Sequence, residues 1–115
     1  MKIGYLQFDP AFGQVDRNLD KVVALIENAG ADLLVLPELF NTGYLFTSLK
    51  EARDLAEEVP GGRTTEALVR AAKKNGIHIV GGLAERSGDK IYNSAVLVSP
   101  DGFVAVYRKI HLFFE

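Results

Sequence analysis

The fold class is decided by the stretch Asp32-Leu33-Leu34-Val35-Leu36-Pro37, a short and continuous apolar run. Such a run is typical of a strand that is buried on both faces of a sheet, as the strands of parallel sheets are. Pro37 has no backbone N–H, so it can end the hydrogen-bonding ladder of that strand. The sequence therefore predicts a buried strand that ends just before Glu38.

The segment before this strand predicts another strand and a helix. Residues 2–9 place apolar side chains among smaller or polar ones, which is typical of a strand. Asp16 is the expected N-cap of a helix that runs to about Ala29. Apolar residues recur along this helix at intervals of three and four and form one face, namely Leu19, Val22, Val23 and Ile26.

Two helices and three strands are predicted after the buried strand. Ser48 and Glu51 fit a capping box at the start of the first helix. The apolar side of that helix is formed by Leu49, Ala52, Leu55 and Ala56. Thr64 or Thr65 is the expected start of the second helix, and Gly76 its end. The strands are expected over residues 77–84, 91–99 and 103–107, with turns between them.

The predicted order of elements is β-α-β-α-α-β-β-β. Helices separate the early strands, which favours parallel crossovers, and short turns separate the late strands, which favours hairpins. We therefore expect an α/β fold with a mixed sheet. A chain of 115 residues holds at most one domain, and its 48% hydrophobic and 24% charged content is that of an ordinary globular protein.

Composition and charge exclude several function classes. The formal net charge of −2 gives no electrostatic footprint for nucleic acid or for an anionic membrane. No apolar run is long enough to span a bilayer or to resemble a signal peptide, so we expect a cytoplasmic protein. The absence of cysteine excludes a disulfide or a thiolate nucleophile within these residues. The two histidines, His78 and His111, are too scattered to predict a metal site.

Glu38 is the first candidate for chemistry. It follows a buried strand, and open α/β sheets bind their ligands at the carboxyl ends of their strands. A partly dehydrated carboxylate there has a raised pKa and can act as a general base. By position alone, a solvated glutamate in a loop is the more common situation.

Lys109 is the second candidate, because a single ammonium in a cleft can stabilise a developing oxyanion. The basic residues of this segment, Arg108, Lys109 and His111, equally fit a solvated strand end or a phosphate contact. Phe40 and Tyr44 can wall a small pocket, or can simply pin their loop to the core. Asn93 interrupts an apolar strand, and we expect it to tie neighbouring loops together through side-chain hydrogen bonds.

Two segments together resemble the catalytic segments of the nitrilase superfamily. Leu36-Pro37-Glu38-Leu39-Phe40-Asn41-Thr42-Gly43-Tyr44 resembles the loop that carries the catalytic glutamate, and Tyr107-Arg108-Lys109-Ile110-His111-Leu112 resembles the catalytic-lysine segment. They occur in the order of the family, and Tyr92-Asn93-Ser94-Ala95 between them matches a further family pattern. Similarity also extends over residues 2–9, 16–28 and 60–62.

The resemblance implies the N-terminal part of an αββα sandwich, with a mixed sheet and helices on one face, and a Glu-Lys-Cys triad. Glu38 would be the general base for a cysteine thiol, and Lys109 would stabilise the tetrahedral intermediate on the way to a thioester. Tyr44 and Phe40 would line the acyl pocket. No metal or organic cofactor is implied. The substrate would be a small-molecule amide or nitrile of a carboxylic or amino acid, the branch amidase-like, and the complete protein a homo-oligomer.

The nucleophile of the family lies beyond Glu115, so we expect residues 1–115 to be the N-terminal portion of one hydrolase domain, inactive alone. Glu115 falls one position before the second glutamate of many members and is not assigned to it. The main alternative is a non-catalytic α/β module, or a half-chain that assembles with a separate partner. A Rossmann-type nucleotide binder has only the β-α-β start in its favour, because Gly81 and Gly82 lack the strand-to-helix glycine pattern.

Overall fold

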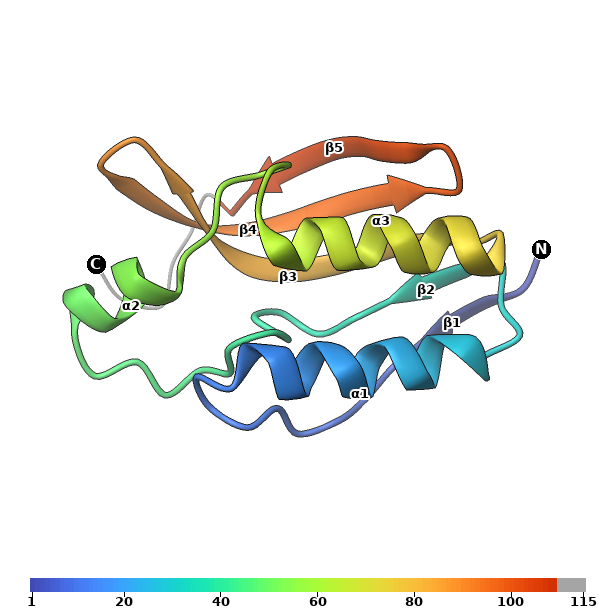
Figure 1. The fold of residues 1–115 in the computed structure, drawn as a ribbon, viewed down its shortest axis with the longest axis horizontal. Helices are drawn as coiled ribbons and strands as arrows, with labels where there is room; N and C mark the ends of the chain where they lie inside the picture. Colours follow the sequence, from blue (N-terminus) through green and yellow to red (C-terminus); the bar gives the residue numbers. More distant parts are fainter. Residues whose placement is uncertain (110–115) are drawn as a thin grey trace.

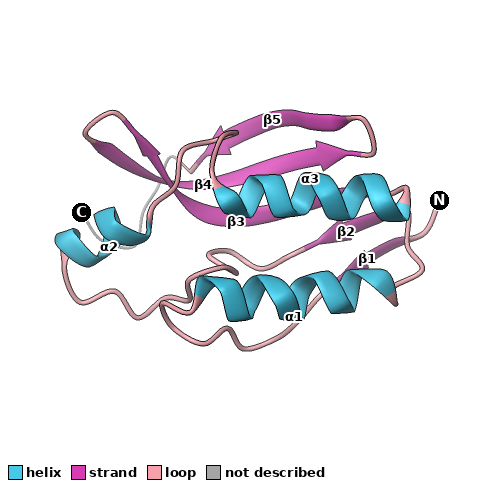
Figure 2. Cartoon of the chain, viewed as in Figure 1, coloured by secondary structure: helices cyan, strands magenta, loops and turns pink. Residues whose placement is uncertain are grey.

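The computed structural model describes residues 1–109, which form one five-stranded sheet with helices packed against one face (Figures 1 and 2). The strands are β1 (Ile3–Tyr5), β2 (Leu33–Val35), β3 (His78–Ser87), β4 (Lys90–Ser99) and β5 (Gly102–Arg108). The helices are α1 (Val15–Glu27), α2 (Leu49–Leu55) and α3 (Arg63–Asn75). The predicted α/β class and element order are confirmed.

The sheet is mixed, with its strands in chain order from β1 to β5. β1, β2 and β3 pair in parallel through helical connections, whereas β3, β4 and β5 pair antiparallel through tight turns. The first two strands are shorter than the sequence predicts, with three residues each. β3 extends three residues past its predicted end, because its long hairpin with β4 continues as far as the pair Ser87 and Lys90.

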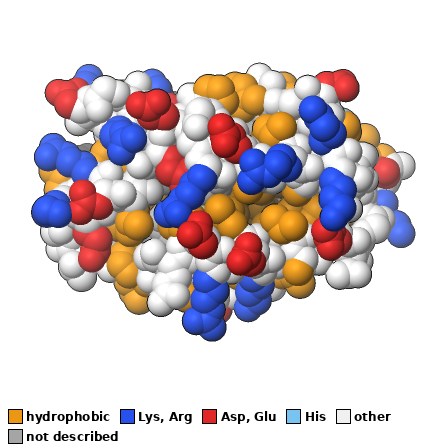
Figure 3. Space-filling model, in the orientation of Figure 1, with side chains coloured by type: hydrophobic (Ala, Val, Ile, Leu, Met, Phe, Trp, Pro, Cys, Tyr) orange, Lys and Arg blue, Asp and Glu red, His pale blue; other side chains and the backbone are white. Residues whose placement is uncertain are grey.

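One face of the sheet carries the hydrophobic core beneath α1 and α3. Three of the four predicted apolar positions of α1, Leu19, Val22 and Ile26, are buried in the core, whereas Val23 is only partly buried. α3 contributes Leu68 and Ala72, and the strands contribute the side chains that point toward the helices. On the outside, the ion pairs Asp16–Arg63 and Glu27–Lys74, each 2.8 Å, join α1 to α3. Charged side chains of both signs surround apolar ones on this face (Figure 3).

The other face of the sheet is open among residues 1–109. Cross-strand register places one row of side chains on it, from Tyr5 on β1 through β2, β3 and β4 to Ala105 on β5. Several apolar residues remain exposed there, including Tyr5, Val35 and Tyr107. No helix within the described residues is long and apolar enough to cross a membrane.

The helix starts differ from the predicted ones. α1 begins at Val15 with Gln14 in the N-cap position, so the predicted N-cap Asp16 is wrong; it lies in the first turn and pairs with Arg63. α3 begins at Arg63 after Gly62 and ends at the predicted Gly76, whose φ of 66° is left-handed. The capping contact at Ser48 is confirmed, since its hydroxyl accepts the Glu51 N–H at 3.1 Å.

The predicted apolar side of α2 is only partly covered by the described part of the chain. Ala56, at the C-cap, is buried and Leu55 packs partly against the core, whereas Leu49 is exposed. This helix lies near the turn end of the β3–β4 hairpin, away from α1 and α3 (Figure 1). Leu49 is consequently largely exposed. The period of apolar residues predicted the helix, but it could not show that no part of residues 1–109 covers Leu49.

Candidate active site

Glu38 is held where the chain leaves the sheet after β2. The Leu36 N–H still bonds to the Val80 carbonyl at 2.7 Å, and the Phe40 N–H bonds to the Gly82 carbonyl at 3.1 Å. Between these two bonds the backbone of Glu38 passes directly over β3. A Cβ on Gly82 would lie 2.8 Å from the Glu38 Cα, so only glycine lets the two backbones approach this closely.

The residues after Glu38 form a tight turn. Leu39 has a φ of 51°, a left-handed conformation that is uncommon for a residue with a side chain. The Gly43 N–H closes the turn on the Leu39 carbonyl at 2.9 Å, and the Gly13 N–H bonds to the Thr42 carbonyl at 2.9 Å. Such a conformation persists only where the surroundings fix the chain on both sides.

Glu38, Asn93 and Lys109 meet at the end of the open face. The Lys109 Nζ lies 3.2 Å from Oε1 of Glu38, and the Asn93 amide also donates to Oε1. The Lys109 backbone N–H bonds to the Asn93 carbonyl at 2.8 Å, which fixes the lysine beside the asparagine. Both charged side chains are about one third exposed, at 33% for Glu38 and 38% for Lys109. The structure thus joins residues that lie 71 positions apart in the sequence.

Tyr44 lies at the rim of this cluster, where the charges of both Glu38 and Lys109 affect its pKa. Burial raises the pKa of the Tyr44 phenol, the negative charge of Glu38 raises it further, and the positive charge of Lys109 lowers it. The side chain is nevertheless 53% exposed, so it has surface to offer a ligand. Its hydroxyl is therefore a neutral donor beside an ion pair at neutral pH.

Phe40 differs from Tyr44 although both belong to the same loop. Its ring is fully buried in the core, within reach of Gly81 and packed with Leu36 and Leu68. The burial favours the loop-anchoring role over a substrate contact. Sequence spacing could not separate the two roles, because both residues are aromatic and sit in one turn-rich segment.

The comparisons with known proteins bear on the whole chain. The family model described as carbon-nitrogen hydrolase matches residues 2–115. A nitrilase from Pyrococcus abyssi is 47% identical over 118 residues, covering 100% of this chain and 45% of that protein. A 2-oxoglutaramate amidase from Bacillus subtilis is 41% identical over 116 residues, covering 96% of this chain and 43% of that protein.

The chain belongs to the carbon-nitrogen hydrolase family. Among solved structures, an N-terminal amidase matches 99% of this chain and 29% of its own at a TM-score of 0.90 and 26% identity. Nit3 of Saccharomyces cerevisiae, a member of branch 10 of the nitrilase superfamily, matches 98% of this chain and 45% of its own at a TM-score of 0.84 and 30% identity. The chain spans less than half the length of the curated relatives it matches.

Sequence reasoning missed an ion pair between the buried Glu85 and the exposed Arg108, which fixes the end of β5 in this carbon-nitrogen hydrolase chain. Arg108 donates from Nε and from a terminal nitrogen to the two carboxylate oxygens of Glu85, both at 3.0 Å. The Ser94 hydroxyl donates to the same carboxylate at 2.8 Å. The Arg108 guanidinium also stacks 4.1 Å from the centre of the Tyr92 ring. Because Lys109 follows Arg108 directly, this pair sets where the lysine leaves the sheet.

The contacts of Arg108 lower the pKa of the Glu85 carboxyl, while its burial opposes that shift. The sequence offered one signal for this pair, an arginine beside the candidate lysine, but Arg108 also fitted a solvated strand end. Two other residues of interest from the sequence, His111 and Glu115, lie outside the described residues.

Proposed function

We propose that the complete protein is a carbon-nitrogen hydrolase that cleaves a non-peptide amide or nitrile of a small carboxylic or amino acid. The carrying observation is the meeting of Glu38, Asn93 and Lys109 at the end of the open sheet face. Residues 1–115 contain no cysteine, so the nucleophile would be a cysteine beyond Glu115. We expect these residues to be the N-terminal portion of one hydrolase domain and inactive alone.

Glu38 would act as the general base. Among residues 1–109 its Oε1 receives both hydrogen bonds and its Oε2 receives none, which leaves Oε2 to take the thiol proton. The resulting thiolate would attack the carbonyl carbon of an amide and form a tetrahedral adduct, or attack the carbon of a nitrile and form a thioimidate. Asn93 would hold the carboxylate in the orientation that this transfer needs.

Lys109 would stabilise the negative charge that develops on the oxygen or nitrogen of the substrate. Its ammonium is already fixed 3.2 Å from the base, so little reorganisation accompanies the reaction. When the tetrahedral adduct of an amide collapses, Glu38 would return its proton to the leaving nitrogen, which departs as ammonia or an amine. A thioester would remain, and water would then hydrolyse it. Tyr44 would contact the substrate from the rim, whereas the buried ring of Phe40 would support the loop.

The open face would be covered by a second sheet layer, which completes an αββα sandwich. The exposed apolar side chains of β1, β2 and β5 favour this, because a soluble protein rarely leaves such a surface uncovered. That layer would bring the cysteine to the Glu38 end of the sheet. Association of complete sandwiches into a dimer or larger homo-oligomer is part of the same proposal.

An ω-amide is the substrate that we propose first. The relatives include the 2-oxoglutaramate amidase above and an omega-amidase from Danio rerio that is 44% identical over 101 residues. A relative named nitrilase makes the nitrile the second candidate. Both substrates would be attacked by the same thiolate, and the choice depends on residues outside this chain.

The test uses the full-length protein that carries this chain, with 2-oxoglutaramate and a small aliphatic nitrile as substrates. We expect ammonia release from the amide, and a fall of about 10²–10⁴ in kcat for Glu38→Gln, because the base can no longer accept a proton. The matched control is Glu58→Gln, an exposed carboxylate of the same charge. Wild-type turnover in the Glu38→Gln variant would remove Glu38 from the mechanism.

A further inference from the structure

We propose that Glu57 is a positioning residue, whose buried carboxylate holds Asn41 and thereby the turn that carries Glu38. The proposal rests on the proposed role of Glu38. Glu57 lies in the connection between α2 and α3, far from Glu38 in sequence, and is only 9% exposed. A buried carboxylate needs several hydrogen-bond donors to offset the loss of hydration. The donors around Glu57 therefore identify the groups that it positions.

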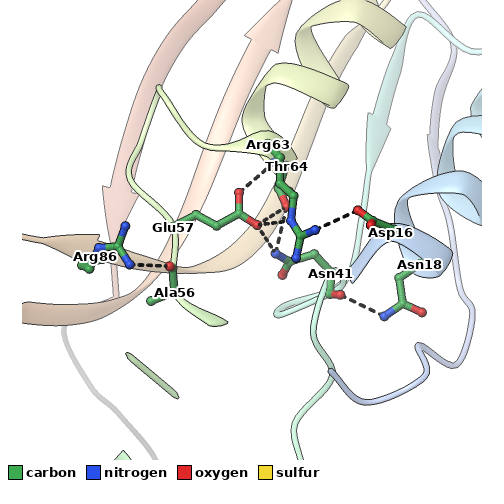
Figure 4. Close-up of polar contacts among 8 residues, drawn as sticks. All are labelled: Asp16, Asn18, Asn41, Ala56, Glu57, Arg63, Thr64 and Arg86. Carbon is green, nitrogen blue, oxygen red and sulfur yellow. Dashed lines mark hydrogen bonds and ion pairs between the residues drawn. The ribbon is translucent and has the colours of Figure 1, made fainter. Parts of the chain in front are cut away.

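The carboxylate of Glu57 is bound on both oxygens (Figure 4). Oε1 accepts the Thr64 backbone N–H at 2.7 Å, and Oε2 accepts the Thr64 hydroxyl at 2.6 Å and the Asn41 amide at 3.2 Å. The Thr64 N–H is one of the unpaired donors in the first turn of α3, so Glu57 caps this helix from a distance. Gly62 makes room for it, since a Cβ there would lie 2.7 Å from Oε1.

Asn41 is held from two sides. Its side-chain amide donates two hydrogen bonds, one to Glu57 and one to the Thr64 hydroxyl at 2.9 Å. Its backbone carbonyl accepts the Asn18 amide at 2.9 Å, so α1 holds the same residue from the opposite side (Figure 4). Asn41 is fully buried, and its Oδ1 has no hydrogen-bond partner among the described residues. The two donated bonds therefore decide how the amide is oriented.

The backbone of Glu57 ties this network to β3. Its N–H bonds to the Ala84 carbonyl at 3.0 Å, and its carbonyl accepts the Arg86 N–H at 2.7 Å. β3 also carries Gly82, over which the backbone of Glu38 passes. A closed path thus runs from β3 through Glu57 and Asn41 into the turn, and back to β3 at the Phe40 N–H.

This closed path explains how Leu39 keeps its left-handed conformation. The turn is fixed before Leu39 by the sheet and after it by Asn41, so relaxing the backbone would break buried hydrogen bonds. Without the Glu57 carboxylate the Asn41 amide loses an acceptor, and the turn can move together with Glu38. A displacement of about 1 Å at a catalytic group can cost about 10²-fold in rate.

The test measures kcat, KM and Tm of the full-length protein with 2-oxoglutaramate, and alkylation of its nucleophile by iodoacetamide. Glu57→Ala is expected to lower kcat and the alkylation rate about 10²-fold with little change in KM. Glu58→Ala, which removes the neighbouring exposed carboxylate, should leave both rates unchanged. Val22→Ala, which truncates a buried side chain of α1, should lower Tm and leave kcat of the folded enzyme unchanged.

Glu57→Gln keeps the shape of the side chain. If Glu57→Ala does not fold, this variant tests whether Glu57 positions the turn. Its amide N–H group would face the Asn41 amide N–H group, so kcat should fall while most of the fold is kept. Adding Asn41→Asp restores a donor–acceptor pair of reversed polarity and should recover part of the loss.

Wild-type kcat in folded Glu57→Gln, or a loss of Tm alone in Glu57→Ala, would overturn the positioning role. Glu38→Gln separates this failure from that of the proposed function. If Glu38→Gln abolishes turnover while the Glu57 variants keep it, only the positioning role fails. If Glu38→Gln turns over normally, the proposed function fails first.

Discussion

Glu38 and Glu57 are two carboxylates tied to the same turn, in opposite surroundings. Glu38 is one third exposed at the open face and, among residues 1–109, accepts hydrogen bonds from Asn93 and Lys109 on a single oxygen. Glu57 is nearly buried and accepts hydrogen bonds on both oxygens. A carboxylate with an uncommitted oxygen can exchange a proton, whereas one bound on both sides can only hold its neighbours in place.

The comparison extends to the cation of the site. Lys109 contacts Glu38 through one hydrogen bond from its ammonium, while Arg108 beside it binds the buried Glu85 through two parallel hydrogen bonds. The planar guanidinium fork suits a fixed structural pair, and the ammonium suits a group that must also meet a substrate. In both cases a structural carboxylate lies behind a proposed catalytic residue.

Removing the ammonium of Lys109 is the largest change that this comparison predicts. Lys109→Ala in the full-length protein should lower kcat about 10²–10³-fold, as loss of one oxyanion donor does. Tm should change little, because the side chain is more than one third exposed. Steady-state kinetics and thermal unfolding of the same sample check it. A variant that keeps near-normal kcat would remove Lys109 from the site.

Adjacent glycines on β3 offer a matched pair of substitutions. Gly82→Ala would push a Cβ to 2.8 Å from the Glu38 Cα, whereas Gly81→Ala would meet the Phe40 ring at 2.9 Å. We expect Gly82→Ala to lower kcat about 10²-fold. Gly81→Ala should mainly destabilise the core, by about 1–3 kcal/mol. If Gly82→Ala and Gly81→Ala had the same kcat per folded molecule, the close approach of Glu38 to Gly82 would not matter for catalysis.

The Glu85–Arg108 pair predicts a pH dependence of stability. Because Arg108 lowers the pKa of Glu85 in the folded state, the ionised pair stabilises the fold above the unfolded pKa of about 4.3. That stability is lost as pH falls through the lower folded pKa. The free energy of unfolding of Arg108→Ala should therefore be lower than that of the wild type at neutral pH. The difference between the two should shrink as the pH falls from about 6 to about 3. Urea unfolding across that range measures it; a constant difference would exclude the ionised pair as its cause.

The smallest effect is expected at the rim. Tyr44→Phe removes one hydroxyl that would contact substrate, so KM should rise about 2- to 10-fold while kcat changes little. In the unliganded protein, the pKa of this phenol, measured by ultraviolet absorbance, should be higher than that of an ordinary tyrosine, because burial and Glu38 raise it. Loss of kcat without any change in KM would place Tyr44 in the chemical step instead.

The sequence predicted the elements well because their signals are local. The apolar run at residues 32–37, the glycine at Gly76 and the turn before Gly102 each depend on neighbouring residues. It also placed Glu38 and Lys109 among the candidates, through the segments that resemble the family. Their contact could not be derived from those segments, because it depends on the register of β4 and β5 and on the path over Gly82.

The supporting network escaped sequence reasoning for a physical reason. Glu57 and Glu85 are single acidic residues, and an acidic residue is usually solvated. Only the fold shows that they are buried and saturated with donors. The same network explains the wrong start predicted for α3, since Glu57, and not a residue of the helix's own N-terminus, accepts the Thr64 N–H.

The most direct test of the difference between Glu38 and Glu57 is the pH dependence of nucleophile alkylation in the full-length protein. Glu38→Gln should remove the base, so alkylation should follow the pKa of an unassisted thiol, near 8.5. Glu57→Gln should lower the rate at every pH and leave the shape of the wild-type profile unchanged. A wild-type profile in Glu38→Gln would contradict the assignment of Glu38 as the base, and a reshaped profile in Glu57→Gln would contradict a purely positional role for Glu57.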